Sequence, residues 1–281
     1  MPKSRETIKP KQVHRELLDE QTPELLKELH LLTRDGGLNA DARRKLKQVN
    51  HLVNLLNPAL EDIFNRFESP LAVDVGAGKA YLGFILYQLY FSPKQKGQII
   101  SIESRDELVQ KARDMAQRLN FSKMEFINST IESYSLNLVA PIRINLVTAL
   151  HACDIASDEA LILGVRAKVD YIAVVPCCQA EVAELLRKEK TSSVESLWHH
   201  GIHRREFGSH LTNVIRVLAL EALGYQVTVT ELVGWEHSLK NEFILAKRVQ
   251  NENGMAKNKL KAVLSEFKIK PKIIRDLFAD L

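Results

Sequence analysis

The chain has 281 residues, of which 45% are hydrophobic and 26% are charged, the composition of an ordinary globular protein. Its length is enough for one large domain with additions or for two small domains. The longest apolar run, residues 81–91, is too short to span a bilayer, and the N-terminus lacks the apolar core of a secretory signal. Three cysteines, an odd number, argue against a disulfide scaffold. We therefore expect a cytoplasmic protein without a membrane partner.

The net charge of +4 is small, but the basic residues are unevenly spread along the chain. They are concentrated near the N-terminus, ahead of the first predicted strand, and in the last 25 residues. Basic clusters bind phosphates, and they also occur on solvated helix faces, so both interpretations stay open. The second of these clusters consists of Arg43, Arg44, Lys45 and Lys47.

Residues 1–68 are predicted to be a helical extension, because they lack strand patterns. The sequence Thr-Pro-Glu at 22–24 is a typical helix start, with a capping threonine, a proline at the first position and an acid in the first turn. A second helix is predicted over residues 39–56, and Pro58 is expected to end it. A third helix is predicted over residues 59–67.

From residue 70 onward, short runs rich in β-branched residues alternate with helical periods. This alternation predicts an α/β fold, in which a mostly parallel sheet carries helices on both faces. A helix at 211–223 and two more strands, 225–231 and 242–249, bring the sheet to seven strands. We expect the sheet domain to occupy residues 69–249, and a basic helical tail to occupy residues 250–281. The first five strands are predicted at residues 71–75, 99–103, 124–127, 144–150 and 171–175.

The segment DVGAGKA, residues 74–80, joins the first predicted strand to an apolar helix. Glycines at such a turn let the backbone approach a ligand closely. A dinucleotide site would need a third glycine at position 81, where this chain has Tyr81. Asp74 ends the strand just before the turn, where a carboxylate attracts a cationic amino group or sulfonium and repels a pyrophosphate.

This turn resembles the first motif of class I S-adenosylmethionine (SAM)-dependent methyltransferases, Asp/Glu-x-Gly-x-Gly-x-Gly. Asp74, Gly76 and Gly78 match the motif, and Ala80 replaces its third glycine. Alanine is small, so the departure is slight. The resemblance implies a Rossmann-like fold with SAM as the cofactor, bound at Asp74, Gly76 and Gly78.

Two further positions fit the same resemblance. Glu103 ends the second predicted strand, where a carboxylate can accept both hydroxyls of a ribose, although a solvated strand end is the alternative. Ser129 and Thr130 follow the third strand, where this superfamily usually contacts the adenine, but an ordinary turn explains these residues equally well.

The fourth and fifth predicted strands end in ALHACDIASDEAL and VVPCCQ. These segments resemble a subgroup of methyltransferase-like proteins with His-x-Cys-Asp and Pro-Cys-Cys motifs, related to a tRNA 2′-O-methyltransferase family. The resemblance covers about residues 40–248, including His237, Lys240 and Asn241 in a later loop. Because parallel strands present their carboxyl ends at one edge, it implies that both segments meet the glycine turn.

Three chemistries remain open for these segments. His151 or Asp154 can remove a proton from a hydroxyl acceptor. Cys177 or Cys178 can act as a thiolate nucleophile, as in pyrimidine methylation. Together with His151 the cysteines also have zinc-ligand types, but adjacent cysteines rarely share one tetrahedral site, and we assign no metal. The alternatives without chemistry are a hydrogen-bonded structural histidine and small buried cysteines.

The predicted substrate is an RNA, either tRNA or rRNA. We expect it to bind through the basic cluster ahead of the first predicted strand, Arg43, Arg44, Lys45 and Lys47, and through Arg204 and Arg205. Trp198 lies beside these arginines and offers a stacking ring, unless it is part of a folded lid. We further expect the leucine faces of the N-terminal helices to cover the apolar helix at 81–91. The alternatives are a methyltransferase for small molecules or proteins, and a silent RNA-binding module. The oligomeric state is not indicated.

Overall fold

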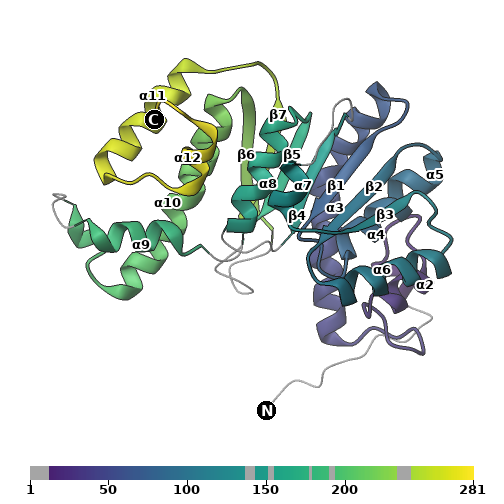
Figure 1. Cartoon of the computed structure of the whole chain (residues 1–281). Helices are drawn as coiled ribbons and strands as arrows, with labels where there is room; N and C mark the ends of the chain where they lie inside the picture. The colour runs from purple at the N-terminus through teal and green to yellow at the C-terminus, as the bar shows by residue number, and fades with distance from the viewer. Residues whose placement is uncertain (1–12, 137–142, 151–154, 177–178, 190–193, 233–241) are drawn as a thin grey trace, which may run out of the picture. The chain divides into compact units, whose positions relative to one another are not determined.

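The computed structural model describes residues 13–136, 143–150, 155–176, 179–189, 194–232 and 242–281 (Figure 1). The chain divides into two compact units, Met1–Ser129 and Thr130–Leu281, which are described here one at a time. Its seven strands form one sheet in the order β3-β2-β1-β4-β5-β7-β6. The predicted α/β fold with a seven-stranded, mostly parallel sheet is confirmed. The strands are β1 Leu71–Val75, β2 Gln98–Glu103, β3 Met124–Asn128, β4 Leu146–Leu150, β5 Tyr171–Val175, β6 Tyr225–Glu231 and β7 Glu242–Arg248.

In the first unit, β1, β2 and β3 are parallel neighbours. Every residue of β1 is buried, which agrees with its apolar sequence; Asp74 is the one charged residue in it. The register places Asp74 opposite Ser101 and Glu103 opposite Asn128, so the strands end together at one edge. The helices and turns of this unit are η1 His14–Glu16, α2 Pro23–Glu28, α3 Ala40–Arg66, α4 Tyr81–Leu86, the π-helical turn η2 Tyr87–Phe91, α5 Ser92–Lys94 and α6 Asp106–Arg118.

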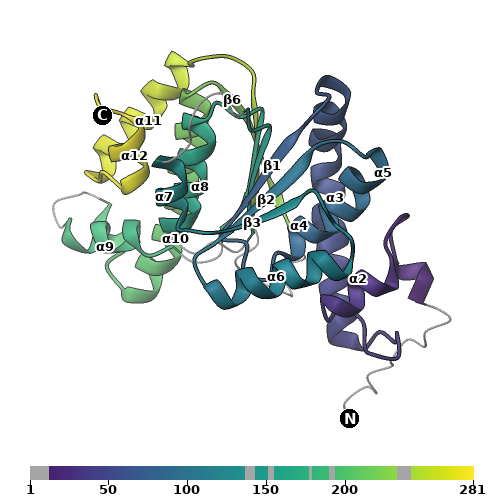
Figure 2. The same cartoon turned by 45° about the vertical axis from the view of Figure 1, so that its right-hand side comes forward.

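Helix α4 packs tightly against the strands of this unit (Figure 2). A Cβ atom on Gly83 would lie 3.1 Å from the Oγ of Ser101 and 3.6 Å from a methyl carbon of Met124. This close approach explains why the helix carries a glycine in its middle. The ring of Phe84 also packs against Phe126 of β3, with the ring centroids 5.6 Å apart. The turn that precedes α4 is therefore held between a buried strand and a buried helix.

The N-terminal segment contacts residues 81–91 through polar groups, while the packing of its leucine faces on them stays a prediction. Gln88 exchanges two hydrogen bonds with Thr22: its Oε1 accepts from the backbone N–H at 3.1 Å, and its Nε2 donates to Oγ1 at 2.7 Å. The hydroxyl of Tyr90 donates to Asn57 of α3 at 2.8 Å. These bonds satisfy polar groups that the apolar packing would otherwise leave buried without partners.

The prediction that Pro58 ends a helix is wrong. Helix α3 runs without a break from Ala40 to Arg66 and includes the proline. A proline inside a helix removes one backbone hydrogen bond and strains the preceding turn. The helix continues because its buried face extends across the proline: Leu56, Leu60 and Ile63 are each at most 2% exposed. Burial of this continuous stripe outweighs the local loss.

In the second unit, β4 and β5 are parallel, whereas β7 is antiparallel to both β5 and β6. Helix α10 is longer than the predicted 211–223, because ten residues before that range join it. The C-terminal helices pack on α8 and α10 through buried side chains that include Leu260, Ile273 and Ile274. The helices of this unit are α7 Ile131–Leu136, α8 Ile155–Arg166, α9 Glu181–Lys188, η3 Glu195–Leu197, α10 Gly201–Ala222, α11 Gly254–Phe267 and α12 Lys272–Leu277.

An aromatic cluster joins three elements of the second unit. Trp198, only 2% exposed, lies with its ring centroid 5.8 Å from Phe207 of α10 and 5.8 Å from Phe267 of α11. Phe207 and Phe267 also touch each other, with centroids 5.5 Å apart. Among the described helices of the whole chain, none is long and apolar enough to cross a membrane.

Candidate functional site

The backbone of the turn after β1 has an unusual conformation. Gly76, Gly78 and Ala80 all have positive φ, of 61°, 59° and 55°. The backbone N–H of Ala77 donates to the carbonyl of Ile102 in β2 at 3.0 Å, which fixes the turn to the neighbouring strand. Alternating left-handed residues of this kind aim successive N–H groups toward a bound ligand.

Ala80 has a backbone conformation that glycine adopts without strain. It is the N-cap residue of α4, is 1% exposed and has a left-handed backbone. The left-handed region costs a non-glycine residue roughly 1–2 kcal/mol. The position is therefore strained, and the departure from the glycine motif is more than a small difference in side-chain volume.

Glu103 closes the site from the adjacent strand. Its Oε2 accepts a hydrogen bond from the backbone N–H of Gly78 at 2.8 Å. Its Oε1 accepts from the backbone N–H of Arg105 at 3.0 Å and from the Nε of the same residue at 2.9 Å. The residue is 7% exposed, so these donors replace most of the water that a carboxylate needs.

The hydrogen bonds to Glu103 decide its charge. Burial alone would raise the pKa of this carboxyl, but the Arg105 side chain and the N–H groups of Arg105 and Gly78 outweigh burial and lower the pKa to about 2. The carboxylate is therefore ionised at neutral pH. An ionised carboxylate accepts hydrogen bonds only, which is the property that a partner for ribose hydroxyls must have.

Arg105 is the residue of this site that sequence reasoning missed. Its Nη2 also donates to Oε2 of Glu103 at 3.2 Å, so the guanidinium spans both carboxylate oxygens. The arginine side chain is 59% exposed, whereas that of the glutamate is 8% exposed. The guanidinium thus lies on the solvent side of the carboxylate. A ligand that bonds to the carboxylate of Glu103 from the solvent side has to displace the guanidinium of Arg105.

Asp74 lies beneath the turn and is 3% exposed. Its Oδ2 is 3.6 Å from the position of a Cβ on Gly83, which places this oxygen toward α4. The carboxylate is thus buried between the end of β1 and α4. Its direct contact with a cofactor stays a prediction.

The two residues after β3 have structural partners. The backbone N–H of Ser129 donates to the carbonyl of Glu103 at 3.1 Å, which extends the pairing of the two strands. The Oγ1 of Thr130 accepts from the backbone N–H of Ser133 at 3.1 Å and caps α7. These contacts fit the interpretation of an ordinary turn. An additional contact of Ser129 and Thr130 with adenine stays a prediction.

All four predicted catalytic residues lie outside the described part of the chain. They are His151, Asp154, Cys177 and Cys178. The loop residues His237, Lys240 and Asn241 lie outside it as well. Within the described ranges, no three His, Cys, Asp or Glu side chains are arranged to hold a metal ion.

The basic residues of α3 are largely paired with acids. Arg43 bonds to Glu16 at 2.5 Å, and both Arg44 and Lys45 pair with Asp41. The pairing with Glu16 raises the pKa of Arg43 further. Part of the positive charge that the sequence shows is thus neutralised locally. Lys47 is exposed on the same helix and contributes its charge to the surroundings of Glu16.

The basic end of α10 has a different arrangement. The guanidinium of Arg204 donates to the carbonyls of Trp198 and His199, at 3.4 and 3.3 Å, and Arg205 pairs with its neighbour Glu206 at 2.9 Å. Of the two interpretations of Trp198, the folded one is correct. Its ring is enclosed by phenylalanines and is not available to stack on a base.

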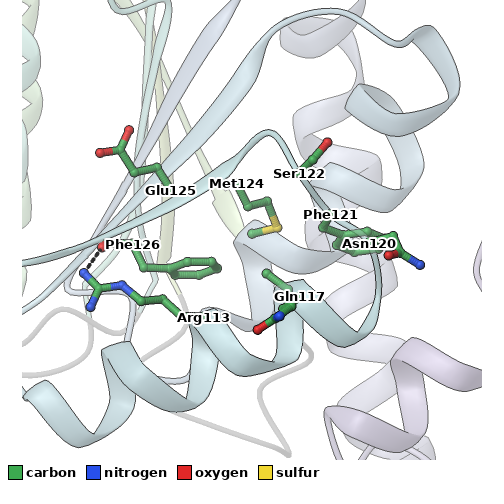
Figure 3. Close-up of a pocket in the computed structure, with 9 residues that line it drawn as sticks. Arg113, Gln117, Asn120, Phe121, Ser122, Met124, Glu125 and Phe126 are labelled. Atoms are coloured by element: carbon green, nitrogen blue, oxygen red, sulfur yellow. Dashed lines mark hydrogen bonds between the residues drawn. The ribbon is translucent and has the colours of Figure 1, made fainter.

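A groove in the first unit lies apart from the glycine turn. It has a volume of about 710 Å³ and is lined by the second half of α6, the loop that follows and the start of β3 (Figure 3). Arg113 spans one side, donating to the carbonyl of Phe126 at 2.6 Å. None of its lining residues belongs to the turn at 74–80 or is Glu103. It is therefore not part of the candidate site.

Comparison with known families gives the class of the protein. The sequence model of a family described as a methyltransferase domain matches residues 44–185, just over half of the chain. The chain belongs to this methyltransferase family. The matched residues include the glycine turn, Glu103 and both cysteine-containing segments of this methyltransferase.

Curated relatives of this methyltransferase have low sequence identity to it. The glutathione S-transferase C-terminal domain-containing protein of Homo sapiens is 23% identical over 235 residues, which cover 75% of this chain and 34% of that protein. The chain thus spans between about a fifth and a third of the length of the curated relatives it matches.

Solved structures with a similar fold are also remote in sequence. Cofactor-bound Rv0187 from MTB is 16% identical, with a TM-score of 0.49, and the alignment covers 86% of this chain and 96% of that one. M. capricolum TrmK in complex with S-adenosyl-homocysteine is 13% identical, with a TM-score of 0.41, over 79% of this chain and 90% of that one. Likenesses at this level carry no argument about the substrate of this methyltransferase.

Proposed function

We propose that the protein is a SAM-dependent methyltransferase whose substrate is an RNA, either tRNA or rRNA. The observation that carries the cofactor assignment is the bond between the Gly78 N–H and the ionised carboxylate of Glu103. It brings a glycine turn and a strand-end acid, 25 residues apart in sequence, into one small site. This is the arrangement that a nucleoside with a charged tail needs.

The residues of the first unit fit SAM on three counts. Gly78 has open space where a side chain would be: a Cβ there would meet only the Nη2 of Arg105, 3.8 Å away. Glu103 is ionised and can accept two ribose hydroxyls once Arg105 moves aside. Asp74 supplies negative charge beneath the turn for a cationic amino group or sulfonium. SAM, when bound, supplies an electrophilic methyl group.

The chain's own task in methyl transfer is alignment and proton removal. Holding the acceptor in line with the methyl group supplies much of the rate enhancement. For a hydroxyl acceptor, His151 or Asp154 is proposed to remove the proton, and Cys177 and Cys178 remain the alternative nucleophiles. The sequence places all four directly after β4 and β5.

RNA is proposed as the substrate class because basic residues gather on two helices. On α3, Arg44, Lys47 and His51 recur at helical spacing on one exposed face. On α10, Arg204 and Arg205 lie in the first turns beside exposed histidines. Lys and Arg at such positions contact phosphates without regard to sequence. Methylation of a small molecule or of a protein would not require these residues.

Two measurements test the proposal. Titration calorimetry with S-adenosylhomocysteine should show binding to the wild-type protein and weaker binding to Glu103→Ala, by about 1–3 kcal/mol, because the hydroxyls lose their acceptor. Glu107→Ala, an exposed acid in the first turn of α6, is the matched control and should bind as the wild type does. Tritium transfer from labelled SAM into total RNA, compared with total protein, then identifies the acceptor class. Absence of cofactor binding would refute the cofactor assignment, and label in protein alone would refute the RNA substrate.

A further inference from the structure

The last strand of the sheet, β6, presents an open edge in the second unit. Among the described strands, β6 pairs with β7 alone, and α10 packs beside it (Figure 1). The backbone N–H of Val249 donates to the carbonyl of Gly224 at 3.0 Å, so Gly224 faces β7. Because the backbone groups of an antiparallel strand point alternately to its two sides, Tyr225, Val227 and Val229 face away from β7. Within the described part of the chain, no hydrogen bond reaches the outward groups of Val227 and Val229.

The sequence of β6 lacks the features that normally protect an edge strand. Its seven residues, YQVTVTE, include four β-branched residues in a row, no proline and one charged residue, Glu231. Val229, in the middle of the outward positions, is 47% exposed. Proteins usually protect an edge with lysine, proline or a covering element, because an uncharged edge pairs readily with another strand. Strand β6 is therefore suited to pairing.

The other edge strand of the sheet, β3, is closed by a cation. The backbone N–H of Ser129 donates to Glu103 of β2, so alternate residues of this strand face β2 and Phe126 faces outward. The outward carbonyl of Phe126 accepts from the guanidinium of Arg113 at 2.6 Å. The sequence of β6 contains no lysine or arginine that could occupy its edge in the same way. The two edges of the sheet thus differ in their capacity to pair.

An apolar groove lies along the open edge. It has a volume of about 430 Å³ and is lined by residues of α10 and β6. Three half-buried residues of α10, Val214, Val217 and Leu218, share one helix face and line the groove together with Val229. A strand added beside β6 would therefore also cover apolar side chains, which favours its attachment.

A second copy of β6 fits this edge in an antiparallel register. If Thr228 lies opposite itself on a twofold axis, Val227 comes opposite Val229 of the second copy. In the same register Tyr225 comes opposite Glu231, so the one acid of the strand does not meet its own copy. All these residues face outward, and opposite residues of this kind exchange two backbone hydrogen bonds per pair. This register pairs all residues of the strand, whereas a shift of the axis to another residue shortens the overlap.

We propose that the protein forms a twofold-symmetric dimer, in which the β6 strands of two copies pair around Thr228 and join the two sheets. The groove along each edge then faces the second copy, and the apolar residues of both grooves are covered. The assembly ends at two copies, because each remaining edge is a β3 strand that Arg113 closes. The dimer does not depend on the proposed methyl transfer.

Disulfide cross-linking tests the register. Thr228 is exposed, and on the axis its Cα should lie about 4.5 Å from its copy, which is within the range for a disulfide. Thr228→Cys should therefore form an intermolecular disulfide with oxidised glutathione, seen on a non-reducing gel and located by mass spectrometry of the linked peptide. Gln226→Cys is the matched control: Gln226 is exposed on the same face of β6, but in this register it lies about 13 Å from its copy along the strand. It should cross-link at least about tenfold more slowly, and the wild type, with the same native cysteines, gives the background.

Light scattering of the full chain tests the dimer itself. Between about 1 and 100 µM the mass should rise from 31.9 kDa toward twice that value, because association depends on concentration. Val229→Lys places a charge on the open edge and should raise the dissociation constant of the dimer at least about tenfold. Ile202→Lys is the matched control, since Ile202 is 62% exposed in the first turn of α10, and it should dimerise as the wild type does.

Four outcomes would overturn the inference. They are a wild type that stays monomeric at the highest concentration, a mass that grows beyond the dimer, a dimer that Val229→Lys leaves unchanged, and equal cross-linking at positions 226 and 228. If Val229→Lys does not fold, the comparison of Thr228→Cys with Gln226→Cys decides. A monomeric wild type would leave the edge of β6 to a strand of a different protein.

Discussion

The carboxylate of Glu103 accepts a hydrogen bond from the backbone N–H of Gly78 at 2.8 Å, across 25 residues of sequence. The same carboxylate is spanned by the guanidinium of Arg105. One acid therefore holds the glycine turn in place and also carries the acceptor capacity for a ligand. These two roles can be separated by experiment. The bond to the glycine turn requires the ionised carboxylate and is tested by pH, whereas ligand binding competes with Arg105 for the carboxylate and is tested by replacing Arg105.

Glu103 should make stability depend on pH in the acid range. The pKa of Glu103 in the folded protein, about 2, is below the ordinary value of 4.5. The ionised carboxylate therefore adds its full contribution to the free energy of unfolding above about pH 4.5, and this contribution is lost as the pH falls toward 2. The full shift corresponds to about 3 kcal/mol, and since Arg105 is largely exposed we expect about half of this. Urea unfolding of Glu103→Gln from pH 7 to pH 3 should show a difference from wild type that narrows below pH 4.5. A difference that is constant over this range would contradict the assignment.

Arg105→Ala should strengthen binding of S-adenosylhomocysteine by about threefold, because Glu103 is then released from an exposed ion pair of about 1 kcal/mol or less. The melting temperature should hardly change. Arg113→Ala is the control, since Arg113 lies on α6, the helix that Arg105 precedes as N-cap residue, and bonds to the carbonyl of Phe126 instead. Weaker binding in Arg105→Ala would mean that the guanidinium itself contacts the cofactor.

Gly78→Ala and Gly224→Ala should lower the free energy of unfolding by different amounts. Both glycines have positive φ, of 59° and 87°, but a Cβ at position 78 meets nothing closer than 3.8 Å, whereas at 224 it lies 2.2 Å from the carbonyl oxygen of Gln250. We expect a loss of about 1 kcal/mol for Gly78→Ala, from backbone strain alone, and several times more for Gly224→Ala. Denaturant titration of both variants checks this. Equal losses would show that the turn at 78 is less open than described.

Reversing charge on α3 should weaken RNA binding. The double variant Arg44→Glu/Lys47→Glu leaves the pair between Arg43 and Glu16 intact and removes only the exposed pair between Arg44 and Asp41, so stability should change little. With bulk tRNA as the probe, affinity should fall about tenfold, and the salt dependence should decrease by about two units of slope. Lys259→Glu/Lys261→Glu, on exposed positions of α11, makes the same change in net charge. Equal effects of the two double variants would indicate a nonspecific response to charge.

The strands were predictable because their apolar runs are short, dense in β-branched residues and bounded by turns. Their observed limits agree with the predictions within two residues. The glycine turn was also visible, since its chemistry is confined to a few adjacent positions. Pro58 was misjudged because a local rule was applied where a long buried face, from Leu56 to Ile63, decides the outcome.

Long-range pairing could not be predicted from the sequence. Arg105 looks like an ordinary surface residue until the structure places it over Glu103. Glu16 and Arg43 are 27 positions apart, and no pattern in either segment predicts their ion pair. The hydrogen bonds of Asn213 to Gln179 and Glu242 are similar: each member is an ordinary polar residue, and only the packing of α10 brings them together.

The enclosed ring of Trp198 makes its fluorescence sensitive to the packing of the C-terminal helix α11 on α10. Because Phe267 of α11 forms one wall around this indole, separation of α11 from α10 would bring water to the ring. Indole emission shifts to longer wavelength in water, and the chain has only two tryptophans. In a Trp235→Phe background, the emission maximum would therefore be an optical signal for the attachment of this segment, readable during ligand titration without any label.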